Sequence, residues 1–215
     1  MKRLSVIMLI LAMLIFVSCT PPSNQTTSSS AVVTSSNDAH ITSISLATDS
    51  AHNITASSNG LYYIVLPTNL LENRSADKAV DDYKSASDFS KGYTDCFTNQ
   101  DGTMTLVFTS SQYEKFKLTN FSFCKLTTLS SNSSIKNVVF GDDLITSATV
   151  YVNMSLYAKS PDDQYQSTTG LAYFIGMYQM ACNVPPNNWH TTITVEDDST
   201  HKILTIGNFP EDGMN

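Results

Sequence analysis

The sequence predicts an α+β domain in which antiparallel β-hairpins form a sheet with helices packed on one face. Two observations lead to this prediction. Tight-turn signals lie between segments that alternate in polarity or are rich in β-branched and aromatic residues, and strands joined by tight turns pair antiparallel. Single helical patterns separate these hairpins, which is typical of helices that cover an antiparallel sheet.

The first predicted hairpin turns at Asn59-Gly60, a strong two-residue turn signal. Its second arm, residues 61–66, is rich in β-branched and aromatic side chains. Pro67 ends this arm, because proline lacks the N–H that a sheet ladder needs. An earlier stretch, residues 41–48, alternates less regularly, and its assignment as strand or linker stays open.

A short amphipathic helix is predicted over residues 75–89. Ser75 is the expected N-cap, and apolar side chains follow it at three- and four-residue spacing. A second hairpin is predicted around residues 99–102. Gly102 supplies the positive φ that a type I turn closed by a bulge requires.

A longer helix is predicted to begin at Ser111 and to run to about residue 129. Glu114 follows Ser111 at the spacing of a capping box, in which the two side chains bond each other's backbone N–H groups. The pattern leaves this helix with one apolar face, formed by Tyr113, Phe116, Phe121 and Cys124.

The C-terminal half predicts two hairpins and a buried helix. The first hairpin turns at residues 141–143, and the second is expected within residues 189–209. Between them, residues 170–182 are almost entirely apolar. A helix of this length is too short to cross the ~30 Å hydrocarbon core of a membrane, so it is expected to be buried in the domain.

The N-terminus is typical of a secretory signal peptide, residues 1–18. Lys2 and Arg3 precede an apolar block over residues 4–17, and a small residue, Ser18, follows it. As a helix this block would be roughly 21 Å long, which is short of the ~30 Å hydrocarbon core.

The end of the signal and the residue after it, Phe16-Val17-Ser18-Cys19, resemble the lipobox of bacterial lipoproteins, Leu-(Ala/Ser)-(Gly/Ala)-Cys. Phe16 stands where that pattern prefers leucine. The resemblance implies that Cys19 becomes the lipidated N-terminus of the mature protein, carrying acyl chains such as palmitate. Two or three acyl chains are enough for stable anchoring to the cell membrane. The alternative is an ordinary secretory signal in which Cys19 is incidental.

Residues 19–37 are predicted to be a flexible tether. They are rich in Ser, Thr, Pro, Asn and Gln, and such a segment cannot bury enough apolar surface to offset its conformational entropy. A chain of this length spans roughly 20–25 Å on average. Residues 38–215 are then expected to form a single α+β extracytoplasmic domain.

The chain is acidic, with a formal net charge of −7. Loss of Lys2 and Arg3 with the signal peptide would make the charge −9, and no basic stripe is present. Nucleic-acid binding is therefore disfavoured. The expected partners are the membrane, through the lipid anchor, and a protein or a component of the cell wall.

Three cysteines remain if Cys19 is acylated: Cys96, Cys124 and Cys182. Their neighbours in sequence are apolar, which favours small buried hydrophobic side chains. Two alternatives stay open. One is an internal disulfide that leaves the third thiol free, and the other is a reactive or metal-bound thiol.

The sequence predicts no catalytic, cofactor-binding or metal-binding residues. The four histidines show neither the i, i+4 pair nor the finger spacing of metal ligands, and no Gly-x-Ser-x-Gly elbow or phosphate loop is present. Trp189 and His190 form a candidate binding patch, since tryptophan is frequent among the residues that dominate interfaces. An alternative is an envelope hydrolase whose pocket would gather two or more of Asp142, Asp143, Asp162, Asp163, His190 and His201.

Three segments resemble an uncharacterised family of cell-surface lipoproteins of Gram-positive, often gut-dwelling, bacteria. They are YTDCFTNQDGTMTLVFTSSQYEKF, SSIKNVVFGDDLITSATVYVNM and GLAYFIGMYQMACNVPPNNWHTTITVEDDSTHKIL. The resemblance covers roughly residues 53–209. It implies an α+β lipoprotein and carries no catalytic residues to this chain.

The expected function is thus a lipid-anchored extracytoplasmic protein with a non-enzymatic binding or envelope-associated domain. The envelope hydrolase is the alternative. A third class, the solute receptor of a transporter, needs two lobes around a cleft, and about 180 residues disfavour it.

Overall fold

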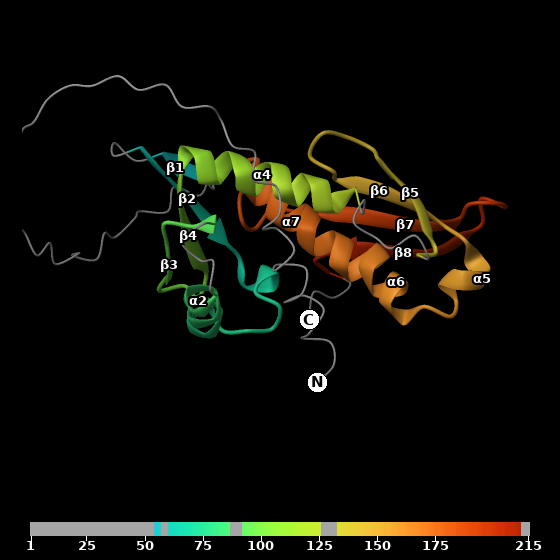
Figure 1. The fold of residues 1–215 in the computed structure, drawn as a ribbon, viewed down its shortest axis with the longest axis horizontal. Helices are drawn as coiled ribbons and strands as arrows, with labels where there is room; N and C mark the ends of the chain where they lie inside the picture. The colour runs from blue at the N-terminus through green and yellow to red at the C-terminus, as the bar shows by residue number, and fades with distance from the viewer. Residues whose placement is uncertain (1–53, 57–59, 87–91, 126–132, 212–215) are drawn as a thin grey trace, which may run out of the picture. The chain divides into compact units, whose positions relative to one another are not determined.

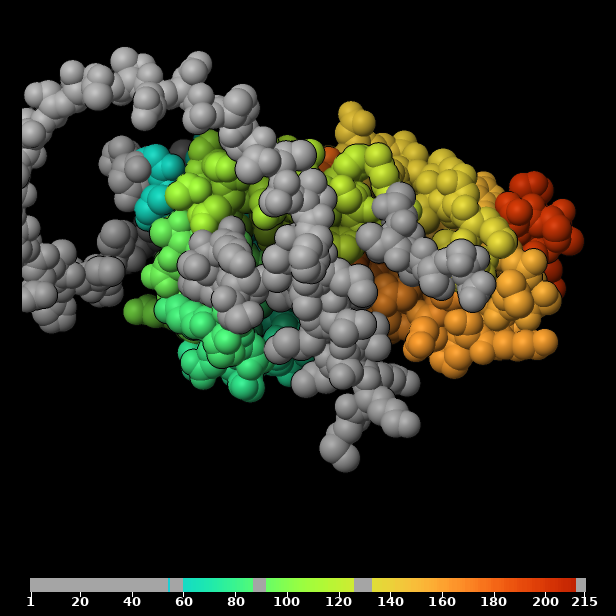
Figure 2. Space-filling model, viewed as in Figure 1, coloured from blue at the N-terminus to red at the C-terminus, as the bar shows by residue number. Residues whose placement is uncertain are grey.

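A computed structural model describes residues 54–56, 60–86, 92–125 and 133–211 (Figure 1). It contains helices and two four-stranded sheets, so the predicted α+β class is confirmed. The predicted hairpins do not join one sheet, however, but divide between the two. In the space-filling view the residues coloured cyan to green and those coloured yellow to red occupy different regions (Figure 2).

The first sheet is antiparallel throughout and has the order β1-β2-β4-β3. Its strands are β1 (Ile54–Ala56), β2 (Leu61–Leu66), β3 (Asp95–Thr98) and β4 (Met104–Thr109). Both predicted hairpins are present, although Asn59 lies outside the described residues. Gly102 has a φ of +82°, and its N–H donates to the Asn99 carbonyl at 3.1 Å, which confirms the predicted turn.

Helix α2 (Ala76–Ser85) lies between the two hairpins, as predicted. Its N-cap is Ser75, whose hydroxyl oxygen accepts a hydrogen bond from the Lys78 N–H at 3.3 Å. A single 3-10 turn, η2 (Thr68–Leu70), precedes it and was not predicted. This turn places Leu70 in the core.

Helix α4 (Ser110–Cys124) has its N-cap at Thr109, two residues before the predicted Ser111, so its capping box is a different one. The Thr109 hydroxyl accepts from the Gln112 N–H, and the Gln112 side chain accepts from the Thr109 N–H at 2.8 Å. Thr109 can do this because it is the last, extended residue of β4, with a φ of −72° and a ψ of 164°. The helix ends at Cys124, with Lys125 as its C-cap, about five residues before the predicted end near residue 129.

The second sheet is mixed and has the order β5-β6-β7-β8. Its strands are β5 (Ile135–Phe140), β6 (Ser147–Val152), β7 (Thr191–Asp197) and β8 (Ile203–Phe209). The two predicted hairpins, β5-β6 and β7-β8, form its halves. Strands β6 and β7 pair in parallel, which corrects the expectation of hairpin pairing alone.

The parallel pair is joined by a helical crossover, as parallel strands require. It consists of α5 (Met154–Tyr157), α6 (Pro161–Tyr165), a turn of π-helix η3 (Gln166–Gly170) and α7 (Leu171–Ala181). Only α7 was predicted. The other three elements have only four or five residues each, too few to show the apolar period that reveals a helix in a sequence.

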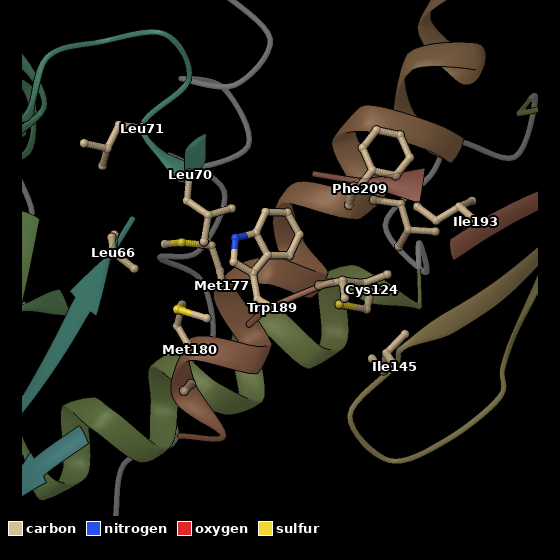
Figure 3. Packing of buried hydrophobic residues seen from close by; sticks show 14 of the residues in the cluster. Leu66, Leu70, Leu71, Cys124, Ile145, Met177, Met180, Trp189, Ile193 and Phe209 are labelled. Carbon is tan, nitrogen blue, oxygen red and sulfur yellow. The ribbon is translucent and has the colours of Figure 1, made fainter. Parts of the chain in front are cut away.

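Helix α7 is buried on most faces, as predicted, because elements of both sheets pack against it. Figure 3 shows buried side chains around this helix. Leu66 comes from β2, Leu70 from the turn η2 that follows it, and Ile193 from β7 of the second sheet. All of them belong to one cluster of buried residues. Among the described residues no helix is long and apolar enough to span a membrane.

Helices α4 and α7 lie side by side and run antiparallel (Figure 1). At one end the Tyr113 hydroxyl donates to the Ala181 carbonyl at 2.7 Å. At the other end the rings of Phe123 and Phe174 stack with their centres 4.7 Å apart. This pairing brings Phe121, near the end of α4, and Tyr178, near the end of α7, to the turn between β5 and β6.

Candidate functional site

A cavity of about 400 Å³ lies where α4, α7 and the β5-β6 turn meet. Six of the described residues line it: Phe121, Phe140, Gly141, Asp142, Asp143 and Tyr178. Three of them are aromatic and two are acidic, so the cavity combines an apolar surface with negative charge.

The aromatic side of the cavity comes from three different elements. Phe121 belongs to α4, Phe140 ends β5, and Tyr178 belongs to α7. The centre of the Phe121 ring lies 6.1 Å from that of Phe140 and 5.2 Å from that of Tyr178, and both pairs are tilted. All three rings are half-buried, so each keeps some surface open to the cavity.

The acidic side is a turn that its own hydrogen bonds hold in place. The Asp142 carboxylate accepts from the N–H groups of Leu144 and Thr146, at 2.9 and 3.1 Å, and from the Thr146 hydroxyl. The bond from the Thr146 hydroxyl, more than any other contact, holds the pKa of Asp142 below its ordinary value. Asp142 therefore stays ionised as the acceptor that shapes the turn.

Tyr178 joins the turn to helix α7. Its hydroxyl donates to the backbone carbonyl of Asp143 at 3.3 Å. Burial is the main reason that the pKa of Tyr178 is raised, so the hydroxyl keeps its proton and remains a donor. The Asp143 side chain has no hydrogen bond or ion pair to any described residue, and it is exposed. Its carboxylate is thus available to a ligand.

Trp189 is a core residue and not part of a surface patch, which corrects the sequence prediction. Its side chain is only 2% exposed and lies among Leu70 and Met177 (Figure 3). The indole N–H donates to the Asn69 side-chain oxygen at 3.1 Å, so the one polar atom is satisfied. The candidate patch is therefore reduced to His190.

His190 is exposed, and its ring Nδ1 lies 3.0 Å from the Asn188 carbonyl. The Gln179 side chain bonds both backbone groups of His190. It accepts from the His190 N–H at 3.1 Å and donates to the His190 carbonyl at 2.8 Å. His190 does not line the aromatic cavity.

Of the six residues named for a hydrolase pocket, the cavity gathers Asp142 and Asp143. Asp163 instead accepts hydrogen bonds from Ser133 and Ser134, and Asp162 is exposed in the first turn of α6. His201 lies in the turn between β7 and β8, where its ring Nδ1 is 3.7 Å from the Glu196 carboxylate. No hydrogen bond or ion pair joins any two of the six within the described part of the chain.

The three cysteines of the folded part are free thiols, so the structure contains no disulfide between them. Cys96 and Cys124 are buried, and burial raises the pKa of both thiols. This environment agrees with small apolar side chains rather than reactive thiolates. Cys182 is half-buried.

Among the described residues, no three His, Cys, Asp or Glu side chains form a group that could hold a metal ion.

Sequence reasoning identified the turn at residues 141–143 but not the cavity beside it. The sequence places Phe121 on the apolar face of one predicted helix, whereas Phe140 and Tyr178 belong to other predicted elements. Only the packing of α4 on α7 brings them together.

No family model, curated protein or solved structure matches this chain. The resemblance to Gram-positive cell-surface lipoproteins therefore stays a prediction that rests on the quoted segments.

Proposed function

We propose that this chain is a lipid-anchored binding protein of the bacterial cell surface. The observation that carries the proposal is the sequence Phe16-Val17-Ser18-Cys19, directly after a basic start and a short apolar block. In this proposal Cys19 carries the acyl chains, residues 19–37 form the tether, and the folded domain stands outside the cytoplasmic membrane. The family resemblance supports the same assignment.

The cavity between α4, α7 and the β5-β6 turn is the proposed binding site. Its rings offer apolar contact, and the Asp143 carboxylate offers one charged group without a partner in the described structure. Ligand sites commonly combine an apolar lining with a few placed polar groups in this way.

An envelope hydrolase is the second candidate, because two carboxylates line this cavity. A hydrolase of the two-carboxylate type needs one acid with a raised pKa, which donates a proton to the leaving group. The pKa of Asp142 is instead lowered, and its oxygens already accept three hydrogen bonds. The binding role is therefore preferred.

The anchor is tested by Cys19→Ala in the producing bacterium, with Cys182→Ala as the matched control. Cells grown with labelled palmitate are expected to label the wild type and Cys182→Ala but not Cys19→Ala. Cys19→Ala is expected to leave the membrane fraction or to accumulate as uncleaved precursor. Intact-mass measurement of the purified protein must show the added acyl mass on the wild type, and its absence would overturn the proposal.

A further inference from the structure

We propose that the cavity binds an organic ammonium group, with Phe121 and Tyr178 against its apolar shell and the Asp143 carboxylate as its counter-charge. The inference rests on the proposed binding function and names the chemical class of ligand. It does not depend on the lipid anchor, so the two can fail separately.

The sign of the ligand's charge follows from the residues that line the cavity. Among the described residues that line it, Asp142 and Asp143 are the charged ones. Asp142 is occupied by its own turn, whereas Asp143 has no partner among the described residues. An anion would meet two carboxylates here, and a cation would find one that is free.

The rings favour an organic cation over a hydrated metal ion. Aromatic faces attract cations through their quadrupole and at the same time offer apolar contact, which suits an ammonium that carries carbon substituents. A hard metal ion would need several oxygen ligands instead. No group of three metal-binding side chains exists among the described residues.

One ammonium already lies at this aromatic cluster. The Lys125 Nζ, at the end of α4, is 4.6 Å from the centre of the Phe121 ring. The Phe121 ring therefore interacts with an ammonium within the protein itself. A second cation beside the ring would be repelled by Lys125, so Lys125 is expected to weaken ligand binding.

The site is pre-organised but open. The bonds to Asp142 and the bond from Tyr178 to the Asp143 carbonyl fix the turn, so little ordering remains for binding. Asp143 is exposed to solvent, and an exposed ion pair contributes little. A dissociation constant on the order of 1–10 mM is expected for a minimal ligand.

The experiment titrates the full chain, purified in a non-ionic detergent, with choline chloride. Chemical shifts of the phenylalanine and tyrosine ring protons report binding. The matched ligand is 3,3-dimethylbutan-1-ol, which has the same shape with carbon in place of nitrogen and no charge. A saturable shift is expected with choline, and at least a threefold weaker interaction with the neutral alcohol.

Two variants test the roles of the charges. Asp143→Asn is expected to weaken choline binding at least threefold, whereas the control Asp162→Asn, an exposed aspartate outside the cavity, leaves it unchanged. Lys125→Met is expected to strengthen binding about twofold, because a like charge is removed. Equal affinity for choline and the neutral alcohol would overturn the inference.

The inference is equally overturned if choline causes no saturable shift up to about 50 mM, roughly five times the weakest dissociation constant expected. A shift with methyl glucoside but none with choline would instead assign the cavity to neutral sugars. That result would leave the proposed binding function standing and reject only the ligand class.

Discussion

The hydroxyl oxygen of Thr191 is buried without a hydrogen-bond partner among the described residues. Its side chain is 1% exposed at the start of β7, and its Oγ1 has no hydrogen-bond partner. It is the only such buried side-chain atom among the described residues. A buried hydroxyl without a partner loses its hydrogen bonds to water on folding and gains none in return.

Thr191→Val is therefore expected to stabilise the domain by about 1 kcal/mol, since valine keeps the shape and removes the unsatisfied oxygen. The measurement is the free energy of unfolding in denaturant. The control is Thr192→Val, because the Thr192 hydroxyl donates to the Asn208 side chain at 3.0 Å and its loss should bring no gain. A Thr191→Val protein less stable than wild type would show that the hydroxyl is satisfied.

At the scale of secondary-structure elements, aspartates attach helices to neighbouring segments. Asp163 of α6 accepts from the Ser134 N–H at 2.7 Å, from the Ser134 hydroxyl at 2.6 Å and from the Ser133 hydroxyl at 3.2 Å. These serines lead directly into β5, so the carboxylate joins the crossover to the edge of the second sheet. Burial raises the pKa of Asp163, but the hydrogen bonds, led by Ser134, outweigh it and hold the pKa below the ordinary value.

A lowered pKa makes this contribution depend on pH in a defined direction. The stabilisation is fully present above the unfolded-state pKa of about 3.9 and is lost as the pH falls through the lower folded-state pKa. Asp163→Asn is expected to lower the free energy of unfolding by about 1 kcal/mol at pH 7, given the partial exposure of this carboxylate. The difference from wild type should shrink below about pH 4.

Denaturant unfolding at a series of pH values measures this difference. Asp162→Asn is the neighbouring control, because Asp162 is exposed and accepts no such set of bonds. A difference between Asp163→Asn and wild type that grows towards low pH would contradict the assignment.

At the scale of the whole molecule, helix α7 connects the two sheets through a close approach at Gly176. A Cβ atom placed there would lie 2.7 Å from the Leu70 Cδ2 and 3.2 Å from the Trp189 Cε3. Leu70 follows the first sheet's β2, and Trp189 precedes the second sheet's β7. Both side chains are buried, so an added Cβ would have to displace the end of the Leu70 side chain within the core.

Gly176→Ala is expected to lower the free energy of unfolding by about 1–3 kcal/mol through overpacking. The direction of this change separates overpacking from helix propensity, because in an exposed helix alanine is favoured over glycine by about 1 kcal/mol and would raise the free energy of unfolding. Gly92→Ala is the control, since a Cβ at Gly92 meets nothing within 4 Å. Thermal and denaturant unfolding provide the measurement, and a Gly176→Ala protein as stable as wild type would show that the two sheets can separate slightly at this contact.

The sequence predicted the elements whose signals are local. The turn at Gly102, the cap at Ser75 and the apolar run of α7 each depend on residues within a few positions of one another, and the structure contains all three. The cap of α4 was misplaced by two residues. The capping-box pattern fits Thr109 with Gln112 as well as Ser111 with Glu114. Only the extended backbone at the end of β4 selects Thr109.

The candidate site was predicted only in part. The turn at residues 141–143 is visible in the sequence, but its aromatic neighbours are not. Phe121 and Tyr178 are 57 positions apart in the chain, and no local pattern links them. Trp189 was assigned to the surface from its residue type, although its place between both sheets buries it.

Sequence patterns alone were sufficient to predict the α+β class, the hairpins and the main helices, and they contain the lipobox-like segment that predicts the anchor. The tertiary structure alone decided the division into two sheets, the parallel pairing of β6 with β7 and the cavity beside Asp143. The physical reason is the range of the interactions. Turns and caps are stabilised by hydrogen bonds between neighbours in the chain, whereas strand order and cavities depend on which distant apolar surfaces pack together.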